Sequence, residues 1–199
     1  MAASSQPTTT DGALDRLTQA LGAARREKRL PPVESWNPPH CGAIDMRIAS
    51  DGTWFYNGSP IGRRELVKLF STVLRRDPDG FVLVTPVEKL TIAVDDAPFA
   101  AVEMALEGEG EGREIAFRTN VDDVVRVGAD HPLRFERDTG DGVKPYLHVR
   151  AGLWARVTRA LTYDLLELGE EREVDGALMF GVAAGGTFYP VAPADEARA

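Results

Sequence analysis

The sequence predicts an α+β fold made of two similar halves, each with the order strand, hairpin, strand, helix, strand. Three observations predict it. Short runs that alternate apolar and polar residues recur through residues 44–193, with glycine-containing turns between them. Helical spacing of apolar residues interrupts these runs twice, over 62–76 and 153–168. After each helical pattern, a turn that contains Asp-Gly leads into an apolar strand, so the second half repeats the pattern of the first.

The size and composition indicate an ordinary globular protein. The chain has 199 residues, 43% of them hydrophobic and 27% charged, which is enough for one sizeable core or two small ones. No run approaches the roughly 20 apolar residues that a membrane span needs. The start, MAASSQPTTTDG, lacks the basic and apolar regions of a secretory signal, and the single cysteine, Cys41, cannot form an internal disulfide. We therefore expect a cytoplasmic protein without membrane association.

The charge of the chain narrows the classes of partner. Its formal net charge is −8. Proteins that bind nucleic acid gain most of their affinity by neutralising phosphates with lysine and arginine, which an acidic chain does poorly. The expected partners are therefore a small anionic ligand or another protein, and not nucleic acid.

The N-terminal region is expected to hold a tail, one helix and a connector. Residues 1–12 are polar and have no periodicity, which is typical of a disordered tail. Residues 13–43 begin with an amphipathic helix on which Leu14, Leu17 and Leu21 share a face. Two Pro-Pro pairs then favour an extended connector, and Trp36 is expected to fix it to the body of the protein. The helix docks either on its own chain or on a partner.

The first half is predicted over residues 44–121. Its strands DMRIAS and TWFYN flank Asp51-Gly52, a strong signal for a tight hairpin. A helix follows over 62–76, and FVLVTP then reads as a buried strand. The last three strands, KLTIAV, AAVEMAL and EIAFRTN, are expected to form a meander with EGEGEG as a hairpin tip.

The second half is predicted over residues 122–193, followed by a short tail at 194–199. Strands LRFERD and PYLHVR lead into a helix over 153–168. Its apolar stripe consists of Leu153, Val157, Leu161, Leu165 and Leu168. The strand ALMFGVA comes after it. Identity between the halves is low, so the prediction is a repeat of pattern.

Motif searches identify no reaction. The sequence has no phosphate loop of the G-x-x-x-x-G-K-[ST] type, no H-E-x-x-H and no G-x-S-x-G. Its three histidines lie far apart in the chain, so no metal site is predicted. Whether the protein is an enzyme stays open, but the residues favour a non-enzymatic role without a cofactor.

Strand alternation supplies the candidate binding face. In PYLHVR, a period of two places Leu147 and Val149 on one face and polar residues on the other. Arginine donors suit carboxylates or phosphates, histidine donates or accepts, and tyrosine offers a ring for stacking. The candidate ligand-binding residues are Arg118, Asn120, Arg134, Tyr146, His148 and Arg150, with Lys89 and Arg63 as second-tier candidates. The alternative is the ordinary solvated face of a sheet.

Long segments resemble the bacterial proteins grouped as domain of unknown function 1285. The resemblance runs from about Leu30 to Pro193 and is carried by WNPPHCGAIDMRIASDGTWFYNGSPIGRRELVKLF, FVLVTPVEKLTIAVDDAPFAAVEM, FRTNVDD, HPLRFE and PYLHVRAGL. It implies two similar halves, the C-terminal one loosely like a pleckstrin-homology domain, with a ligand site where they meet. A nucleotide-type ligand and a signalling role are also implied. The sequence departs from the family pattern at Ala184, where a serine is expected.

Two functional hypotheses follow. The first is a non-enzymatic binding or sensing module that holds an anionic, nucleotide-like small molecule at the interface of the two halves. The second is a protein-interaction module that presents the N-terminal helix or a sheet edge to a partner.

Overall fold

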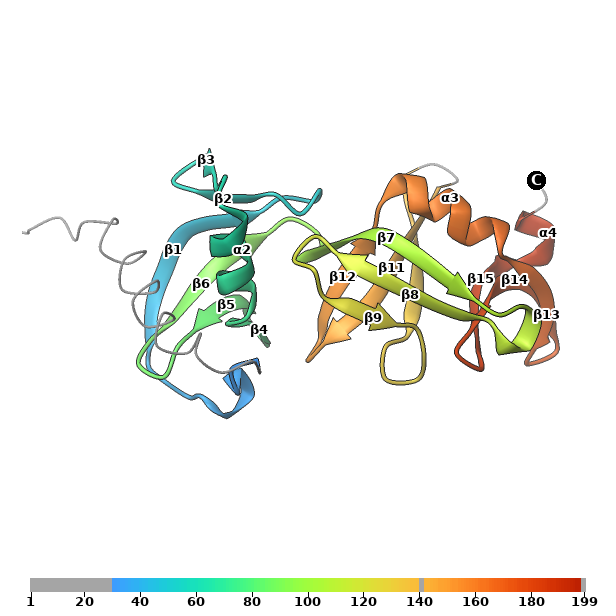
Figure 1. Ribbon diagram of the computed structural model, residues 1–199, viewed down its shortest axis with the longest axis horizontal. Helices are drawn as coiled ribbons and strands as arrows, with labels where there is room; N and C mark the ends of the chain where they lie inside the picture. Colours follow the sequence, from blue (N-terminus) through green and yellow to red (C-terminus); the bar gives the residue numbers. More distant parts are fainter. Residues whose placement is uncertain (1–29, 140–141, 198–199) are drawn as a thin grey trace, which may run out of the picture. The chain divides into compact units, whose positions relative to one another are not determined.

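The computed structural model describes residues 30–139 and 142–197 (Figure 1). The described chain forms two compact units. Unit 1 comprises the residues up to Arg47 together with Trp54–Val94, and unit 2 comprises Ile48–Thr53 together with the chain from Asp95 onward. The tail and the helix predicted within residues 1–29 lie outside the described residues.

Unit 1 contains a six-stranded sheet with the order β3-β2-β1-β6-β5-β4. Strands β1 and β2 are neighbours, as the Asp51-Gly52 turn predicts, and the Ala49 N–H donates to the Thr53 carbonyl at 2.9 Å to close that turn. Helix α2 follows β3. The elements are η1 (Val33–Ser35), β1 (His40–Ile48), β2 (Trp54–Tyr56), β3 (Ser59–Pro60), α2 (Arg64–Ser71), β4 (Leu74–Asp77), β5 (Gly80–Val84) and β6 (Lys89–Val94).

Arg75 fixes the connector before β1, in which Trp36 is half-buried. The Arg75 guanidinium is largely buried, and its Nη1 donates to the carbonyls of Val33 at 2.8 Å and Trp36 at 2.7 Å. Asp77 accepts two further hydrogen bonds from Arg75, at 2.7 and 3.2 Å. The sequence missed this clamp because Arg75 lies within a segment that it assigns to a helix.

Unit 2 contains a second six-stranded sheet with the order β10-β11-β12-β7-β8-β9, and a three-stranded sheet β13-β14-β15. Strand β12 runs parallel to β7, and the other assigned pairs in these two sheets are antiparallel. The elements are β7 (Phe99–Glu107), η2 (Gly110–Gly112), β8 (Glu114–Thr119), β9 (Val124–Arg126), β10 (Leu133–Arg137), β11 (Val143–Arg150), β12 (Leu153–Val157), α3 (Arg159–Glu167), β13 (Glu170–Val174), β14 (Ala177–Ala184), β15 (Thr187–Pro193) and α4 (Ala194–Ala197).

The two six-stranded sheets share one topology. In each, a run of three strands is followed by a second run of three, and the last strand of the second run lies beside the first strand of the first run. Strands β1 to β6 therefore correspond in order to β7 to β12. The predicted duplication of halves is supported at this level. Among the described residues, strands account for 52% and helices for 15%, so the fold is mostly β, and the α+β class expected from the sequence is not confirmed.

The halves begin and end elsewhere than the sequence indicates. The prediction assigns AAVEMAL and EIAFRTN to a first half that ends at residue 121, but β7 and β8 lie in unit 2. The expected meander is also wrong, because β6 and β7 belong to different sheets. Alternation identifies a strand but does not reveal its neighbours, and the break at Asp95–Pro98 carries little signal. The tail predicted at 194–199 contains the short helix α4.

Both predicted helices are too long. Helix α2 ends at Ser71, and Leu74–Asp77 pairs with β5 as strand β4. Residues Leu153–Val157 form strand β12, and α3 begins only at Arg159. In both places the apolar residues satisfy two periods at once, so spacing alone does not decide between helix and strand.

Candidate functional site

Strand β11 separates its two faces largely as predicted. Leu147 and Val149 are buried, while His148 and Arg150 are half-buried. Tyr146 differs from the expectation of a solvated face, because only 3% of it is exposed. It faces Arg134 on β10 and Arg156 on β12. At Tyr146 the polar face of this sheet is therefore shielded from solvent.

The structure brings three of the predicted site residues together around Trp154. The Arg134 guanidinium lies over the rings of Tyr146, at 4.9 Å, and Trp154, at 4.3 Å. The His148 ring meets the Trp154 ring edge-on at 5.1 Å. Such cation-π and aromatic contacts stabilise an outward sheet face without the need for a ligand.

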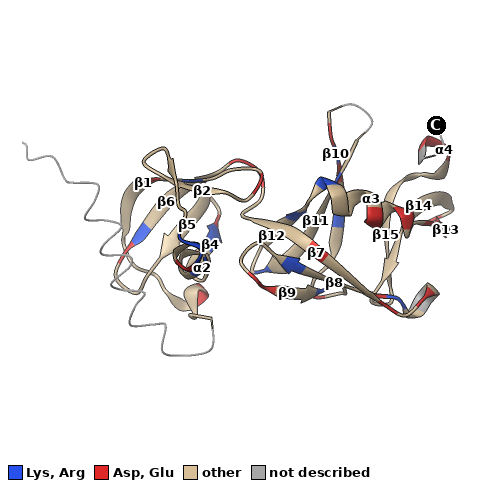
Figure 2. Cartoon of the chain, turned by 45° about the horizontal axis from the view of Figure 1, so that its top comes forward, with Lys and Arg blue, Asp and Glu red and all other residues tan. Residues whose placement is uncertain are grey.

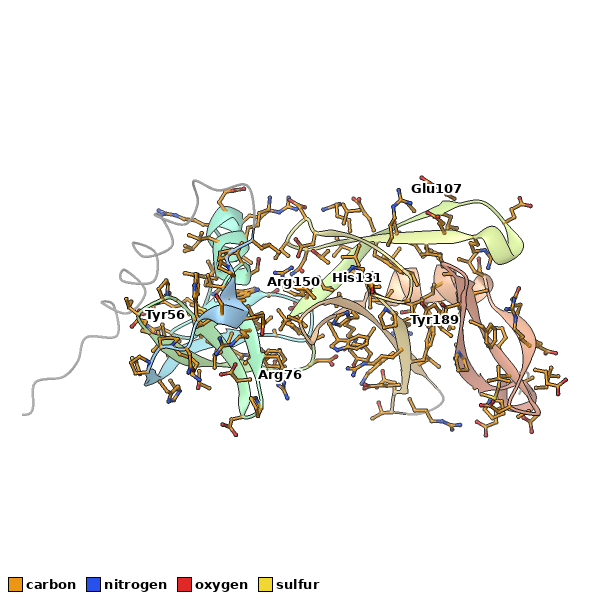
Figure 3. The ribbon with its side chains drawn as sticks, turned by 90° about the horizontal axis from the view of Figure 1, so that it is seen from below. Tyr56, Arg76, Glu107, His131, Arg150 and Tyr189 are labelled. Atoms are coloured by element: carbon orange, nitrogen blue, oxygen red, sulfur yellow. The ribbon has the colours of Figure 1, made fainter. Side chains whose placement is uncertain are left out.

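His148 is held by backbone groups of the β9–β10 loop and of the turn between β11 and β12. Its Nδ1 donates to the Asp130 carbonyl at 3.0 Å, and its Nε2 accepts from the Gly152 N–H at 3.3 Å. The His131 ring stacks on it with centroids 6.0 Å apart (Figure 3 labels His131). Both ring nitrogens of His148 are thus used by backbone groups, which indicates a structural role.

The Asp96 carboxylate connects the side chain of Tyr146 on β11 with that of Arg156 on β12. It accepts from the Tyr146 hydroxyl at 2.7 Å and from Arg156 Nη1 at 3.0 Å. Burial, followed by the bond to Asp96, raises the pKa of the Tyr146 hydroxyl above its usual range, so the phenol stays a donor. Asp96 therefore fixes the direction of the Arg156 side chain.

Arg118 and Arg150 form ion pairs within unit 2. Arg118 pairs with Glu103 and, at 2.7 Å, with Asp122, and its guanidinium holds the pKa of the Glu103 carboxyl below its usual range. Arg150 (Figure 3) pairs with Asp123, and its guanidinium also lies 4.9 Å from the centre of a phenylalanine ring at the start of β7. These ion pairs between partly exposed side chains give both arginines a structural role.

Asn120 holds the hairpin tip between β1 and β2 against β7. Its Nδ2 donates to the Gly52 carbonyl at 3.1 Å, and its Oδ1 accepts from the Ala100 N–H at 3.1 Å. Gly52 has φ +85°, and a Cβ there would lie 2.7 Å from Asn120 Nδ2. Glycine is therefore favoured at the tip, because any other side chain would be strained there and would press on Asn120.

The second-tier candidates lie in unit 1. The Lys89 ammonium pairs with Asp77 at 2.9 Å, which makes it part of the Arg75 clamp. Arg63 precedes the first residue of α2 and is exposed. The other six predicted residues all lie in unit 2.

A cavity of about 550 Å³ lies in unit 2 between the β10–β11 hairpin, the end of β12 and α3. Figure 2 marks lysine and arginine positions on β11 and β12 in blue. Apolar walls come from Val143, Pro145 and Leu166. The polar and charged side chains used in the argument below come from Asp138, Lys144, Arg156, Arg159, Thr162 and Tyr163.

Two of the three cations in this cavity have a carboxylate partner. Lys144 pairs with Asp138 at 2.6 Å, and Lys144, followed by the Thr139 N–H, holds the pKa of the Asp138 carboxyl below its usual range. Arg156 pairs with Asp96. Over residues 30–139 and 142–197, the structure gives Arg159 no carboxylate partner.

Arg159 is oriented by Tyr163 instead. Its Nε and Nη2 each lie 3.3 Å from the Tyr163 hydroxyl oxygen, to which they donate, and this contact raises the pKa of Arg159. The Tyr163 residue is 57% exposed. Its ring is therefore accessible beside a guanidinium with unused donors, an arrangement that suits an anion joined to a planar group.

A smaller cavity of about 280 Å³ adjoins these residues. It shares Arg156, Val157 and Arg159 with the larger cavity. The remaining lining residues are Ser50, Asp51, Ala100 and Thr158. Ser50 and Asp51 belong to the hairpin tip that Asn120 holds in place. Asn120, a predicted site residue, therefore positions lining residues of the smaller cavity and does not itself line it.

Neither a metal cluster nor a membrane-spanning helix is present in the part of the chain that the structure describes. No group of three or more histidine, cysteine, aspartate or glutamate side chains is arranged to hold an ion there. No described helix has the length and apolar character needed to cross a bilayer.

Two family models match the chain. Residues 31–97 match the N-terminal domain of a domain of unknown function, DUF1285, and residues 98–191 match the DUF1285 C-terminal domain. The chain belongs to the DUF1285 family. The division between the two models falls close to the unit boundary at Val94–Asp95.

Solved DUF1285 structures resemble this chain. A DUF1285 family protein from Silicibacter pomeroyi DSS-3 has 45% identity and a TM-score of 0.80, over 90% of this chain and 98% of that one. A DUF1285 family protein from Shewanella baltica OS155 has 25% identity and a TM-score of 0.48, over 61% of this chain and 90% of that one. No curated protein matches.

Sequence reasoning missed the cavity residues of this DUF1285 protein. Arg156 and Arg159 fall in the segment assigned wholly to a helix, which hides the strand alternation of LWARV. Within β12, Leu153, Ala155 and Val157 are buried, while the residues between them are half-buried. That period of two was the signal for a strand whose polar face carries Arg156.

Proposed function

We propose that unit 2 is a non-enzymatic ligand-binding module whose larger cavity holds an anionic, nucleotide-like small molecule. One observation carries the proposal. Three cationic side chains and an accessible tyrosine gather around one cavity of about 550 Å³, in a chain whose net charge is −8. Sites for small molecules usually measure roughly 300–1,000 Å³ and combine apolar walls with a few placed polar groups.

Arg159 is the main anion contact in this proposal. A guanidinium presents donors in a planar fork that matches two oxygens of a phosphate. Lys144 and Arg156 are partly neutralised by their own carboxylates, so they contribute less net charge. The Tyr163 ring offers a stacking surface for a planar base next to the anion.

Binding and sensing, rather than catalysis, fit the chemistry of this lining. Lys144, Arg156 and Arg159 supply donors for an anion. The Thr162 hydroxyl donates to the Thr158 carbonyl at 3.0 Å, and the Tyr163 hydroxyl accepts from Arg159. Both hydroxyls thus support the helix and the guanidinium, and a signalling role would follow from occupancy of the cavity.

The proposal differs from the sequence expectation in the location of the site. The sequence favours a site where the two halves meet, whereas every lining residue of this cavity belongs to unit 2. A likeness of this unit to a pleckstrin-homology domain stays a prediction. The alternative of a protein interaction through the N-terminal helix or a sheet edge also stays a prediction, and residues 13–29 lie outside the described residues.

Thermal unfolding with ADP as the probe tests the proposal. A ligand that binds only the folded state raises Tm in a saturable manner. We expect ADP to raise Tm of the wild type and of Arg126→Ala, a control that removes an exposed arginine outside the cavity. Arg159→Ala should weaken ADP binding at least about tenfold, with unchanged circular dichroism. Equal shifts in all three proteins, or no shift in any, would contradict the proposal.

A further inference from the structure

The two cavities of unit 2 share the two arginines that the proposed anion site uses. Arg156, Val157 and Arg159 line both the 550 Å³ and the 280 Å³ cavity. An anionic group bound by both guanidiniums therefore lies where the cavities adjoin, and a molecule centred there extends into each of them. This geometry points to the chemical class of the ligand.

We infer that the ligand has two arms joined by a phosphate or pyrophosphate group: an aromatic nucleoside in the larger cavity and a smaller sugar in the smaller one. The inference rests on the proposed function and concerns the same site. It assigns the ligand to the class of nucleoside diphosphate sugars.

The central position of the anion follows from how the arginines are held. Asp96 binds Arg156 through one nitrogen, Nη1, at 3.0 Å, and Tyr146 in turn fixes Asp96 at 2.7 Å. Arg159 donates to the Tyr163 hydroxyl through Nε and Nη2. Each guanidinium has five N–H donors, so these contacts orient it and leave donors for phosphate oxygens.

The larger cavity suits the aromatic arm. Its volume is about twice that of its neighbour, and Val143, Pro145 and Leu166 give it apolar walls. The exposed ring of Tyr163 lies beside the shared Arg159. A base that stacks on this ring keeps its phosphate close to the guanidinium.

The smaller cavity suits a neutral arm that carries hydroxyl groups. Its polar lining includes the side chains of Ser50, Asp51 and Thr158. The Asp51 carboxylate accepts the Thr53 N–H at 2.8 Å, which fixes its direction. A negative charge here repels a second phosphate but forms strong hydrogen bonds with sugar hydroxyls.

The wall of the smaller cavity is formed before any ligand binds. Asn120 ties the tip of the hairpin to β7 through the Gly52 carbonyl and the Ala100 N–H, both at 3.1 Å. Ala100 also lines the cavity. Ser50 and Asp51 are therefore fixed relative to Arg156, which reduces the entropy lost on binding.

Isothermal titration with ADP and ADP-ribose tests the inference, since both probes contain adenosine and a pyrophosphate, and ADP-ribose adds the second sugar through an ester bond that removes one negative charge from the terminal phosphate. We expect the wild type to bind ADP-ribose about tenfold more tightly than ADP, as one charge-assisted hydrogen bond allows. Asp51→Asn keeps an acceptor for the Thr53 N–H but removes the charge. It should reduce this preference to less than about threefold.

The outcomes separate this inference from the proposed function. Equal affinities of the wild type for ADP and ADP-ribose would overturn the two-armed ligand and leave the anion site supported. An ADP-ribose preference that persists in Asp51→Asn would overturn the assignment of the sugar to the smaller cavity. If neither probe binds, both proposals fail.

Discussion

The two six-stranded sheets share one strand order, yet the two cavities described above lie in unit 2. The difference lies in what is added to the sheet. In unit 1, α2 is inserted between β3 and β4, whereas in unit 2 α3 follows β12 directly. Helix α3 then supplies Arg159, Thr162 and Tyr163 to the cavity. The repeated strands β11 and β12 thus carry Lys144 and Arg156 of the candidate site, and α3, which lies outside the repeat, completes it.

Two arginines, Arg75 in unit 1 and Arg159 in unit 2, differ in their partners. In unit 1, Asp77 accepts from both Arg75 and Lys89, and these groups secure the connector before β1. In unit 2, Arg159 has no carboxylate partner among the described residues. Charges that are fully paired serve stability, and a guanidinium beside a cavity without such a partner suits ligand binding.

Two matched core substitutions give the largest expected effects. Leu83 on β5 and Leu147 on β11 occupy corresponding strands, and each is 0% exposed. Replacement of either leucine by alanine should lower the free energy of unfolding by about 2–5 kcal/mol, because lost transfer energy and a new cavity add together. Amide hydrogen exchange should show the loss of protection in the unit that carries the substitution. Similar losses spread equally over both units would contradict two separate cores.

Asp77→Asn should have the next largest effect. It leaves the largely buried Arg75 without its carboxylate partner, at a cost of about 2–3 kcal/mol. Urea unfolding of the variant and the wild type measures the difference. A cost below about 0.5 kcal/mol would show that the clamp contributes little.

The same variant gives a pH test. The Arg75 guanidinium, with Lys89 in support, holds the pKa of the Asp77 carboxyl below its usual range. A lowered pKa in the folded state stabilises the protein above the unfolded value of about 3.9, and this stabilisation is lost as the pH falls through the folded pKa. The stability difference between wild type and Asp77→Asn should therefore shrink from about pH 6 to pH 3. A constant difference would contradict the role of the charged carboxylate.

Substitution of Gly52 or Gly58 by alanine should have the smallest effect on stability. Gly52 and Gly58 both have positive φ, +85° and +73°, but only at Gly52 would a Cβ meet a neighbour, Asn120 Nδ2 at 2.7 Å. Gly58→Ala should cost about 1 kcal/mol for backbone strain alone, and Gly52→Ala about 1 kcal/mol more. Thermal unfolding measures both. Equal costs would argue against a tight contact between the hairpin tip and Asn120.

Much of the framework could be predicted from the sequence. The Asp51-Gly52 hairpin, the turn at EGEGEG and most strands follow from local chemistry and alternation. The borders of the repeat could not be predicted, because strand pairing depends on contacts between distant residues. Residues 153–168 show the limit most clearly, since the apolar spacing there fits a helix and hides β12.

The candidate site was predicted only in part. Alternation placed Arg134, Tyr146 and His148 on the polar faces of their strands. In the structure Arg134 contacts the rings of Tyr146 and Trp154, and His148 contacts Trp154. Asn120 proved to be a support for the smaller cavity. The cavity itself depends on where α3 packs, which a residue pattern does not reveal.

The most direct test of the central claim is an NMR titration of the full chain with ADP, following backbone amide and arginine side-chain signals. The account predicts saturable shifts that are largest for Arg156, Arg159 and Tyr163 in unit 2, with little change around Arg63 and Lys89 in unit 1. The largest shifts in unit 1, or no saturable shift in either unit, would contradict it.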